Sequence, residues 1–314
     1  MWSYLAKRIA IGVPTLWVII TVCFFLMRLT PGGPFDAEAP IPDEILANLR
    51  ARYQLDDPLW QQYFTYIWNL LQGDFGPSFK YRDFTVTELI VQGFPISLQN
   101  GLSALMLAIF IGVPMGVAAA LSQNSARDYI VSAVSMTGIV FPNFVMGHIL
   151  ILVFGVLLKD TIFNLPAGGW GDGGLAYRVL PVITLSLPFI AYVARISRGS
   201  MIEAMRSNYV LTARAKGLPF RVVVMRHAMK AAMTPVVTYL GPATAFILTG
   251  SMVVETIFQI PGIGRYFVQG ALNRDYTLVM GVTILSASLI ILMNLFVDLL
   301  YGVLDPKVRY DDQH

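Results

Sequence analysis

The chain has 314 residues, of which 56% are hydrophobic and only 13% are charged. A soluble domain carries about 25% charged residues, so this composition excludes an ordinary soluble enzyme and a disordered chain. The formal charge of +3 argues against a nucleic-acid partner. The single cysteine, Cys23, excludes an internal disulfide framework and a cysteine-based metal cluster.

Apolar runs dominate the chain, and each is long enough, or nearly so, to cross a bilayer as a helix of about 20 residues. The six runs cover residues 9–27, 98–121, 129–158, 179–194, 236–254 and 278–300. The first run exceeds the apolar part of a signal peptide and no small-residue cleavage site follows it, so we expect a retained anchor. The sequence therefore predicts an all-α polytopic membrane protein with six transmembrane helices.

Lysine and arginine are concentrated in the segment that joins the fourth and fifth runs. These residues are Arg195, Arg198, Arg206, Arg214, Lys216, Arg221, Arg226 and Lys230. Basic residues in short loops stay in the cytoplasm, so we expect this segment there. Six spans then place both termini in the cytoplasm, with the chain in the plasma membrane.

The segment between the first two runs is too long and too patterned for a slack loop. Pro58 opens a predicted helix in which apolar residues recur every three to four positions, and Gly73 ends it. We therefore divide the chain into a tail and first span (1–29), an external helical cap (30–93) and a core of five spans (94–314). The cap either covers the outer membrane surface or docks an external partner.

The interiors of the runs contain almost no titratable side chain. His148 is the only one near the middle of a run, and a lone histidine in a helix more often bonds to a neighbour than acts as a relay. The sequence contains no Gly-Lys dipeptide and hence no P-loop, and it has no H-E-x-x-H or G-x-S-x-G motif. We therefore expect neither an enzyme nor a bound cofactor, but a passive channel or a transporter driven by a separate subunit.

The basic loop 198–235 contains a predicted helix of about two turns. Ser207 or Asn208 can cap it, Gly217 can end it in a left-handed conformation, and Pro219 prevents its continuation. A helix of this length is marginal alone in water, so contacts outside itself must hold it. A second, basic helix is expected from about Phe220 to residue 233. Composition leaves two interpretations open: a loop that only sets topology, or a rigid knob that receives a push from a cytoplasmic motor.

Resemblance favours the second interpretation. The segment 212–218, Thr-Ala-Arg-Ala-Lys-Gly-Leu, followed by His227 and Ala228, resembles the coupling loop of ABC-importer permeases of the peptide branch. Further segments similar to that branch are 25–32, 55–59 with Gln62 and Tyr63, 73–79, 195–201, 255–258, 261–264 and 305–310. Leu211 and Thr212 stand where the wider family often has Glu-Ala, and the Leu-Pro that often follows its glycine is replaced around residues 229–230. Both departures are usual in the peptide branch.

This resemblance implies a type I ABC-importer permease fold and a role as one membrane subunit of an ATP-driven oligopeptide importer in the inner membrane. It implies a second, related permease subunit (a heterodimer), two ABC ATPase subunits that bind ATP and Mg, an external peptide-binding protein, and membrane lipid. The residues that would contact the ATPases are Tyr209, Thr212, Ala213, Arg214, Ala215, Lys216 and Gly217. A passive channel or ion-coupled carrier acting alone, and a membrane scaffold without transport, remain the alternatives.

A pathway for peptides of different sequence should bind no side chain tightly. Adaptable methionine and small uncharged polar side chains suit such a pathway. By residue type we expect its lining among Met136, Asn143, Met146, Thr249, Met252 and Asn294.

Overall fold

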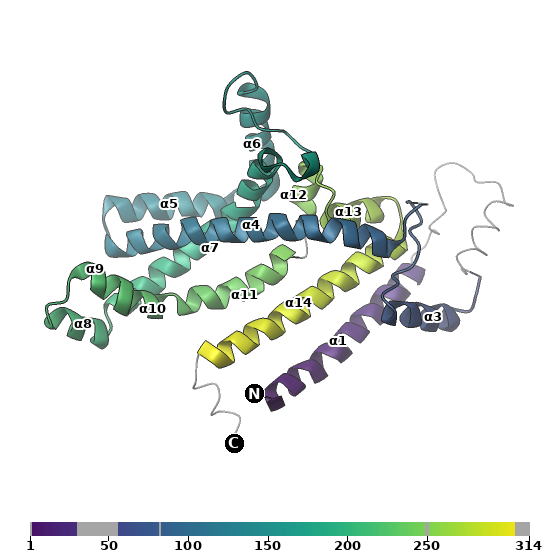
Figure 1. The fold of residues 1–314 in the computed structure, drawn as a ribbon, viewed down its shortest axis with the longest axis horizontal. Coiled ribbons are helices and arrows are strands. Elements are labelled where there is room, and N and C mark those ends of the chain that lie inside the picture. Colours follow the sequence, from purple (N-terminus) through teal and green to yellow (C-terminus); the bar gives the residue numbers. More distant parts are fainter. Residues whose placement is uncertain (1, 30–55, 82, 249–250, 305–314) are drawn as a thin grey trace.

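The computed structural model describes residues 2–29, 56–81, 83–248 and 251–304, and every regular element in these ranges is helical (Figure 1). The α-helices are α1 (Trp2–Leu29), α3 (Leu59–Leu71), α4 (Val86–Leu121), α5 (Ala126–Val140), α6 (Asn143–Leu150), α7 (Leu175–Met205), α8 (Asn208–Ala215), α9 (Phe220–Val222), α10 (Met229–Ala232), α11 (Thr234–Leu248), α12 (Met252–Ile257), α13 (Ile263–Leu272) and α14 (Tyr276–Leu304). Two π-helical segments, Ile151–Leu157 and Val223–Ala228, and a 3₁₀ turn, Gly171–Gly173, complete the described elements.

Four of the predicted runs lie within single long helices. The helices α1, α4, α7 and α14 are long and apolar enough to cross a membrane, as the first, second, fourth and sixth runs predict. The helix α4 begins well before its apolar run because Thr85 and Glu88 form a capping box at its start. The expected division at residue 93 therefore falls inside α4.

The third run is not one straight helix. It is divided into α5 and a second part, α6 with the π-helical segment after it, and the two parts meet at an angle of 101°. The break lies at Phe141 and Pro142, where Phe141 is extended with φ of −80° and ψ of 122°. Proline disfavours helical geometry in the residue before it, and its ring removes a backbone donor, which explains the break.

The fifth run is divided between α11 and α12. Helix α11 has 15 residues and does not reach the length of a span by itself. The described ranges thus contain four candidate spans, or five if the bent pair counts as one. The predicted number of six is not confirmed by these helices.

Helices α4 and α7 form the centre of the bundle. Small residues on α4 let the two backbones approach closely: a Cβ added to Gly116 would lie 2.3 Å from the carbonyl oxygen of Ala194. Nearer the middle of α4, Ala104 and Ala108 pack in a buried apolar core with Phe189 of α7.

The two ends of α4 define two ends of the molecule. The α8 end carries the turn between α4 and α5 (residues 122–125), the last part of α7, and the helices α8 to α10 (Figure 1). The α13 end carries α3, α13 and the start of α14. The predicted helix after Pro58 is confirmed as α3, and it is attached to α1 by a 2.7 Å hydrogen bond between the hydroxyls of Tyr63 and Thr21.

Candidate functional site

The short helix predicted in the basic loop is present as α8, Asn208–Ala215. Ser207 occupies its N-cap position, but the Ser207 hydroxyl donates to the Ala204 carbonyl at 2.6 Å and does not cap the helix. Gly217 follows the helix with φ of 74°, as the terminator prediction requires. The Gly217 N–H donates to the Arg214 carbonyl at 2.9 Å, which closes the last turn.

A buried apolar cluster holds α8 in place. Val210 and Ala213 form the inner face of α8 and are 0% and 5% exposed. They pack with Met201 of α7 and with Val223 and Ala228 of the following helix. Because a two-turn helix is marginal in water, this packing supplies the external support that the sequence predicted. The basic helix expected from Phe220 is also present, with a π-helical segment in its middle.

The outer face of α8 is exposed. Of the predicted coupling residues, Tyr209, Thr212, Arg214, Ala215, Lys216 and Gly217 are exposed, whereas Ala213 belongs to the inner face. Leu211 adds a large apolar side chain that is 50% exposed. The Arg214 guanidinium lies 5.8 Å from the ring centre of Phe220, so this cation is held against the next helix. The result is a rigid projection with an apolar and basic surface.

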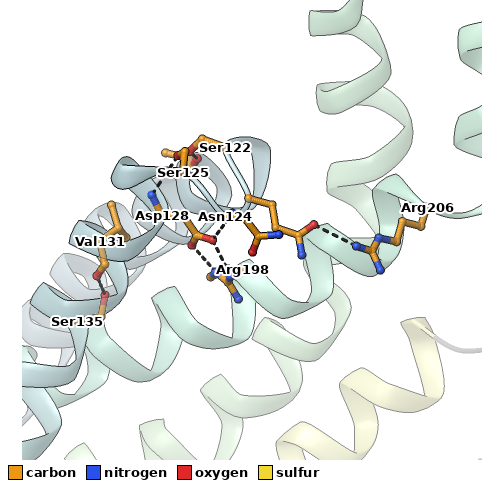
Figure 2. A network of polar contacts seen from close by, with 10 residues as sticks. Ser122, Asn124, Ser125, Asp128, Val131, Ser135, Arg198 and Arg206 are labelled. Carbon is orange, nitrogen blue, oxygen red and sulfur yellow. Dashed lines mark hydrogen bonds and ion pairs between the residues drawn. The ribbon is translucent and has the colours of Figure 1, made fainter.

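A partly buried ion pair lies at the same end of the molecule (Figure 2). The Arg198 guanidinium of α7 donates from Nε to Oδ1 of Asp128 at 2.6 Å and from Nη2 to Oδ2 at 2.7 Å. The backbone N–H of Asn124 donates to the same carboxylate at 2.9 Å. The pairing is bidentate, which fixes orientation as well as distance. It joins the start of α5 to α7.

A second acid, Glu255, is buried at the α13 end. Its carboxylate accepts from the Ser97 hydroxyl at 2.7 Å and from the backbone N–H of Gly264 at 2.8 Å. The acid therefore connects α12, α4 and the first turn of α13. Burial raises the pKa of Glu255 to about 7, although the hydrogen bonds from Ser97 and the backbone of Arg265 lower it. Gly262 leaves room for this carboxylate, since a Cβ there would lie 2.3 Å from Oε2.

A third buried acid, Asp275, precedes α14 and fixes the chain that enters α4. Its carboxylate accepts from the Ser78 hydroxyl and, at 3.1 Å, from the backbone N–H of Lys80. It also accepts from the backbone N–H of Leu278 at 3.2 Å, at the start of α14. The described groups of His, Cys, Asp and Glu include none that could hold a metal ion. Asp128, Glu255 and Asp275 each connect segments that lie far apart in the sequence.

Comparison with known proteins identifies the family of the chain. Residues 112–310 match the family described as the binding-protein-dependent transport system inner membrane component. The chain belongs to this family of permeases. The match covers the last part of α4 and all of α5 to α14, so both features of the α8 end, helix α8 and the Asp128–Arg198 pair, lie within it.

Close relatives of this permease cover its full length. The oligopeptide transport system permease protein OppB of Salmonella typhimurium is 52% identical over 310 residues, which is 99% of this chain and 100% of that protein. OppB of Haemophilus influenzae is 50% identical with the same coverage. The dipeptide transport system permease protein DppB of Bacillus subtilis is 41% identical over 98% of both chains. A solved structure of an amino acid ABC transporter with histidines aligns with 70% of this chain and 94% of its own, at 21% identity and a TM-score of 0.49.

The candidate lining residues of the permease are distributed over separate places. Met136 lies at a hollow of about 170 Å³ between α5 and α7, and Asn143 at one of about 400 Å³ beside the α5–α6 break. Asn294 lies at a third hollow, between α1 and α14. Met146 and Met252 lie on α6 and α12, which pack together, whereas Thr249 falls outside the described residues.

Several residues of the permease that position its elements were not singled out by the sequence. Asp128 and Asp275 follow no motif, and their partners are 70 and 197 positions away in the chain. Arg198 and Glu255 did appear within segments similar to the peptide branch, which is the signal that could have found them. His148 behaves as expected of a lone histidine, because its Nδ1 lies 2.7 Å from the Phe144 carbonyl in the same helix.

Proposed function

We propose that this chain is the permease subunit of an ATP-driven importer for oligopeptides. It would form half of the translocation pathway and would receive mechanical work through α8 from separate ATPase subunits. The observation that carries the proposal is full-length similarity to OppB proteins together with an ordered, exposed α8. The chain itself would hold no cofactor, and ATP and Mg would bind to the ATPases.

The proposed arrangement has six spans with both termini in the cytoplasm of the inner membrane. Helix α11 would belong to the fifth span and the bent pair α5–α6 would be the third. The concentration of lysine and arginine in residues 195–230 supports this orientation, because such residues are retained on the cytoplasmic side. In Figure 1 the start of α1 and the end of α14 lie away from α3 and α13, which agrees with two termini on one side.

The partners follow from the family. A second, related permease would complete the pore, and two ATPases would each grip one coupling helix. An external binding protein would deliver peptides at the α13 end, where α3 exposes Trp60, Phe64 and Trp68. These aromatic side chains also suit the interface between lipid and water, so α3 would lie as a cap on the outer surface.

The mechanism we propose begins at α8. Closure of the ATPase dimer on ATP would draw the two coupling helices together, and this movement would turn the pathway from inward-open to outward-open. Hydrolysis would reverse it.

The pathway would pass the hollow beside the α5–α6 break. Phe141, Asn143, Tyr192 and Phe246 line it with aromatic and uncharged polar groups. Such groups can contact peptides of many sequences without binding one side chain tightly. Met136, Met146, Thr249, Met252 and Asn294 remain candidates for other parts of the lining.

Transport by a reconstituted complex tests the proposal. Proteoliposomes that contain both permeases and both ATPases, with the binding protein outside, should accumulate a labelled oligopeptide only when ATP is present on the ATPase side. A variant ATPase that cannot hydrolyse ATP is the control. Uptake of peptide or an ion by this chain alone, without nucleotide, would instead establish a passive channel or an ion-coupled carrier.

A further inference from the structure

Helix α5 contacts α7 at two places that are separated by a hollow. At the α8 end, Asp128 pairs with Arg198. Near the break, the backbones meet: a Cβ added to Gly138 would lie 2.6 Å from the carbonyl oxygen of Leu187. The hollow of about 170 Å³ between these contacts is lined by residues of both helices, among them Ser135 and Ala191. Helix α5 is thus fixed at its two ends and loosely packed between them.

The contact at the α8 end resists both sliding and rotation. Two guanidinium N–H groups of Arg198 reach the two different oxygens of Asp128, and the Asn124 backbone adds a third donor. A second connection lies nearby, where Nη2 of Arg206 donates to Oε1 of Gln123 at 3.1 Å (Figure 2). The Asp128 side chain is 2% exposed and that of Arg198 33%, so water screens the pair only in part.

The same part of α7 leads directly into α8. Only Arg206 and Ser207 separate the two helices, and the N–H of Ser207 bonds to the Ala204 carbonyl at 3.2 Å. Arg198 lies seven residues before the end of α7 at Met205, which is roughly 10 Å along a helix. A displacement of α8 that moves the end of α7 therefore reaches Arg198 before it reaches the middle of the bundle.

We propose that Asp128 and Arg198 are a positioning pair that makes α5 follow α7 when α8 moves, so that the movement arrives at the Phe141–Pro142 break. The pair acts because α5 ends at a 101° bend, beside which the proposed pathway lies. This inference rests on the proposed function.

A merely structural ion pair makes a different prediction. It would change the amount or the thermal stability of the assembled complex, but each complex that forms would still import a normal amount of peptide per ATP. A pair that transmits movement instead sets that ratio, because ATP would be hydrolysed without full displacement of α5. The number of peptides imported per ATP hydrolysed is therefore the measurement that separates the two roles.

The experiment uses the full complex in proteoliposomes with its binding protein. Asp128→Asn keeps the shape of the side chain but removes the charge, and Arg198→Lys keeps the charge but cannot pair through two nitrogens. Both should lower the ratio of peptide to ATP by roughly fivefold or more while ATP hydrolysis continues. The exchanged pair, Asp128→Arg with Arg198→Asp, should recover part of the ratio. Glu203→Gln, on an exposed acid of α7, is the matched control and should leave the ratio unchanged.

Two results would overturn the inference. One is a wild-type ratio in assembled Asp128→Asn complex. The other is failure of both single variants to assemble while Glu203→Gln assembles normally, which is the behaviour of a pair that only holds the fold. If the wild-type complex itself imported no peptide with ATP, the proposed function would fail, and this result is distinct from the other two.

Discussion

Gly217 and the buried acids show how single residues fix the two ends of the molecule. Gly217 ends α8 with a positive φ, and no heavy atom lies within 4 Å of a Cβ built on it. A glycine is therefore favoured at this position by the backbone conformation and not by a lack of space for a side chain. Asp128, Glu255 and Asp275 act differently, because each accepts hydrogen bonds from two or more elements.

Replacement of Gly217 by valine should uncouple the importer without preventing insertion. A β-branched residue at φ of 74° is strained by about 1–2 kcal/mol, and the strain would shift the end of α8. We expect lower peptide uptake and less peptide-stimulated ATP hydrolysis by the reconstituted complex. Gly73→Val is the matched control, since Gly73 has φ of 80° and equally open surroundings, but lies at the other end. Normal uptake with Gly217→Val would contradict a coupling role for this turn.

The raised pKa of Glu255 predicts that the stability of the folded permease depends on pH. Its pKa is about 7 in the folded chain against an ordinary value of 4.5, so the folded state binds more protons between these values. Stability from this group should therefore fall as pH rises from about 4.5 to 7, by at most about 3 kcal/mol, and then level off.

Thermal unfolding of the detergent-solubilised permease between pH 5 and pH 8 measures this effect. The unfolding temperature of the Glu255→Gln variant should fall less steeply with pH than that of the wild type, because the amide does not titrate. The Glu203→Gln variant, at an exposed acid, should keep the wild-type slope. Identical slopes for wild type and Glu255→Gln would show that another group causes the dependence.

The individual residues differ in how far the sequence predicts them. A glycine after a short helix and before a proline is a local signal, and Gly217 was predicted correctly from it. The partner of Asp128 lies 70 positions away and that of Glu255 lies 158 positions away. No local pattern contains such information, because folding alone brings these side chains together.

At the scale of the elements, small residues allow the helices to pack closely, and long apolar runs determine which helices are long. The close contact of α4 with α7 requires Gly116, whose Cβ would collide with the Ala194 carbonyl. Gly199 of α7 offers a contrast, since no heavy atom lies within 4 Å of a Cβ there. The two glycines lie on the paired helices α4 and α7, but only Gly116 has no space for a side chain.

Gly116→Ala should destabilise the permease by about 2 kcal/mol, because the backbones of α4 and α7 must separate. Gly199→Ala should be neutral or stabilising by up to about 1 kcal/mol, since alanine favours a helix over glycine. Thermal unfolding of both variants in detergent measures the difference. Equal effects at the two positions would mean that the close helix contact does not contribute to stability.

Val210→Asp should detach α8 from the molecule. An unpaired carboxylate at a site with 0% exposure costs at least about 2 kcal/mol, which the small cluster beneath α8 would not offset. Tryptic cleavage after Arg214 or Lys216 in the solubilised permease should accelerate roughly tenfold or more. Leu211→Asp, on the exposed face, should leave the cleavage rate near that of the wild type. Slow cleavage of Val210→Asp would mean that α8 is held by something other than its inner face.

Long apolar runs predicted most of the long helices, because apolar length is the strongest signal in such a chain. The runs 129–158 and 236–254 were exceptions, because each is divided between helices. In the run 129–158 the bend depends on the backbone geometry before Pro142, which hydropathy does not report. The early start of α4 depends on the Thr85 and Glu88 capping box, which lies outside the apolar run. Hydropathy alone therefore found α4 but not its first residue.

At the scale of the whole molecule, separate observations converge on one architecture. A central pair, α4 and α7, carries an exposed projection at one end and buried acids that tie elements together at the other. The composition predicted the membrane class, and the similarity of segments along the whole chain predicted the family to which it belongs. The candidate lining residues Met136, Asn143 and Asn294 were chosen by residue type and lie at separate hollows, so their place in the pathway stays a prediction.

The central claim is that α8 receives work from separate ATPases. Cross-linking from α8 in the assembled complex tests it most directly, in a background where Cys23 is replaced by alanine. Leu211→Cys, on the exposed face, should cross-link to an ATPase subunit with a yield that changes when ATP is added, whereas the buried Val210→Cys should not. Absence of any cross-link from position 211, while ATP-driven peptide import continues, would contradict the claim.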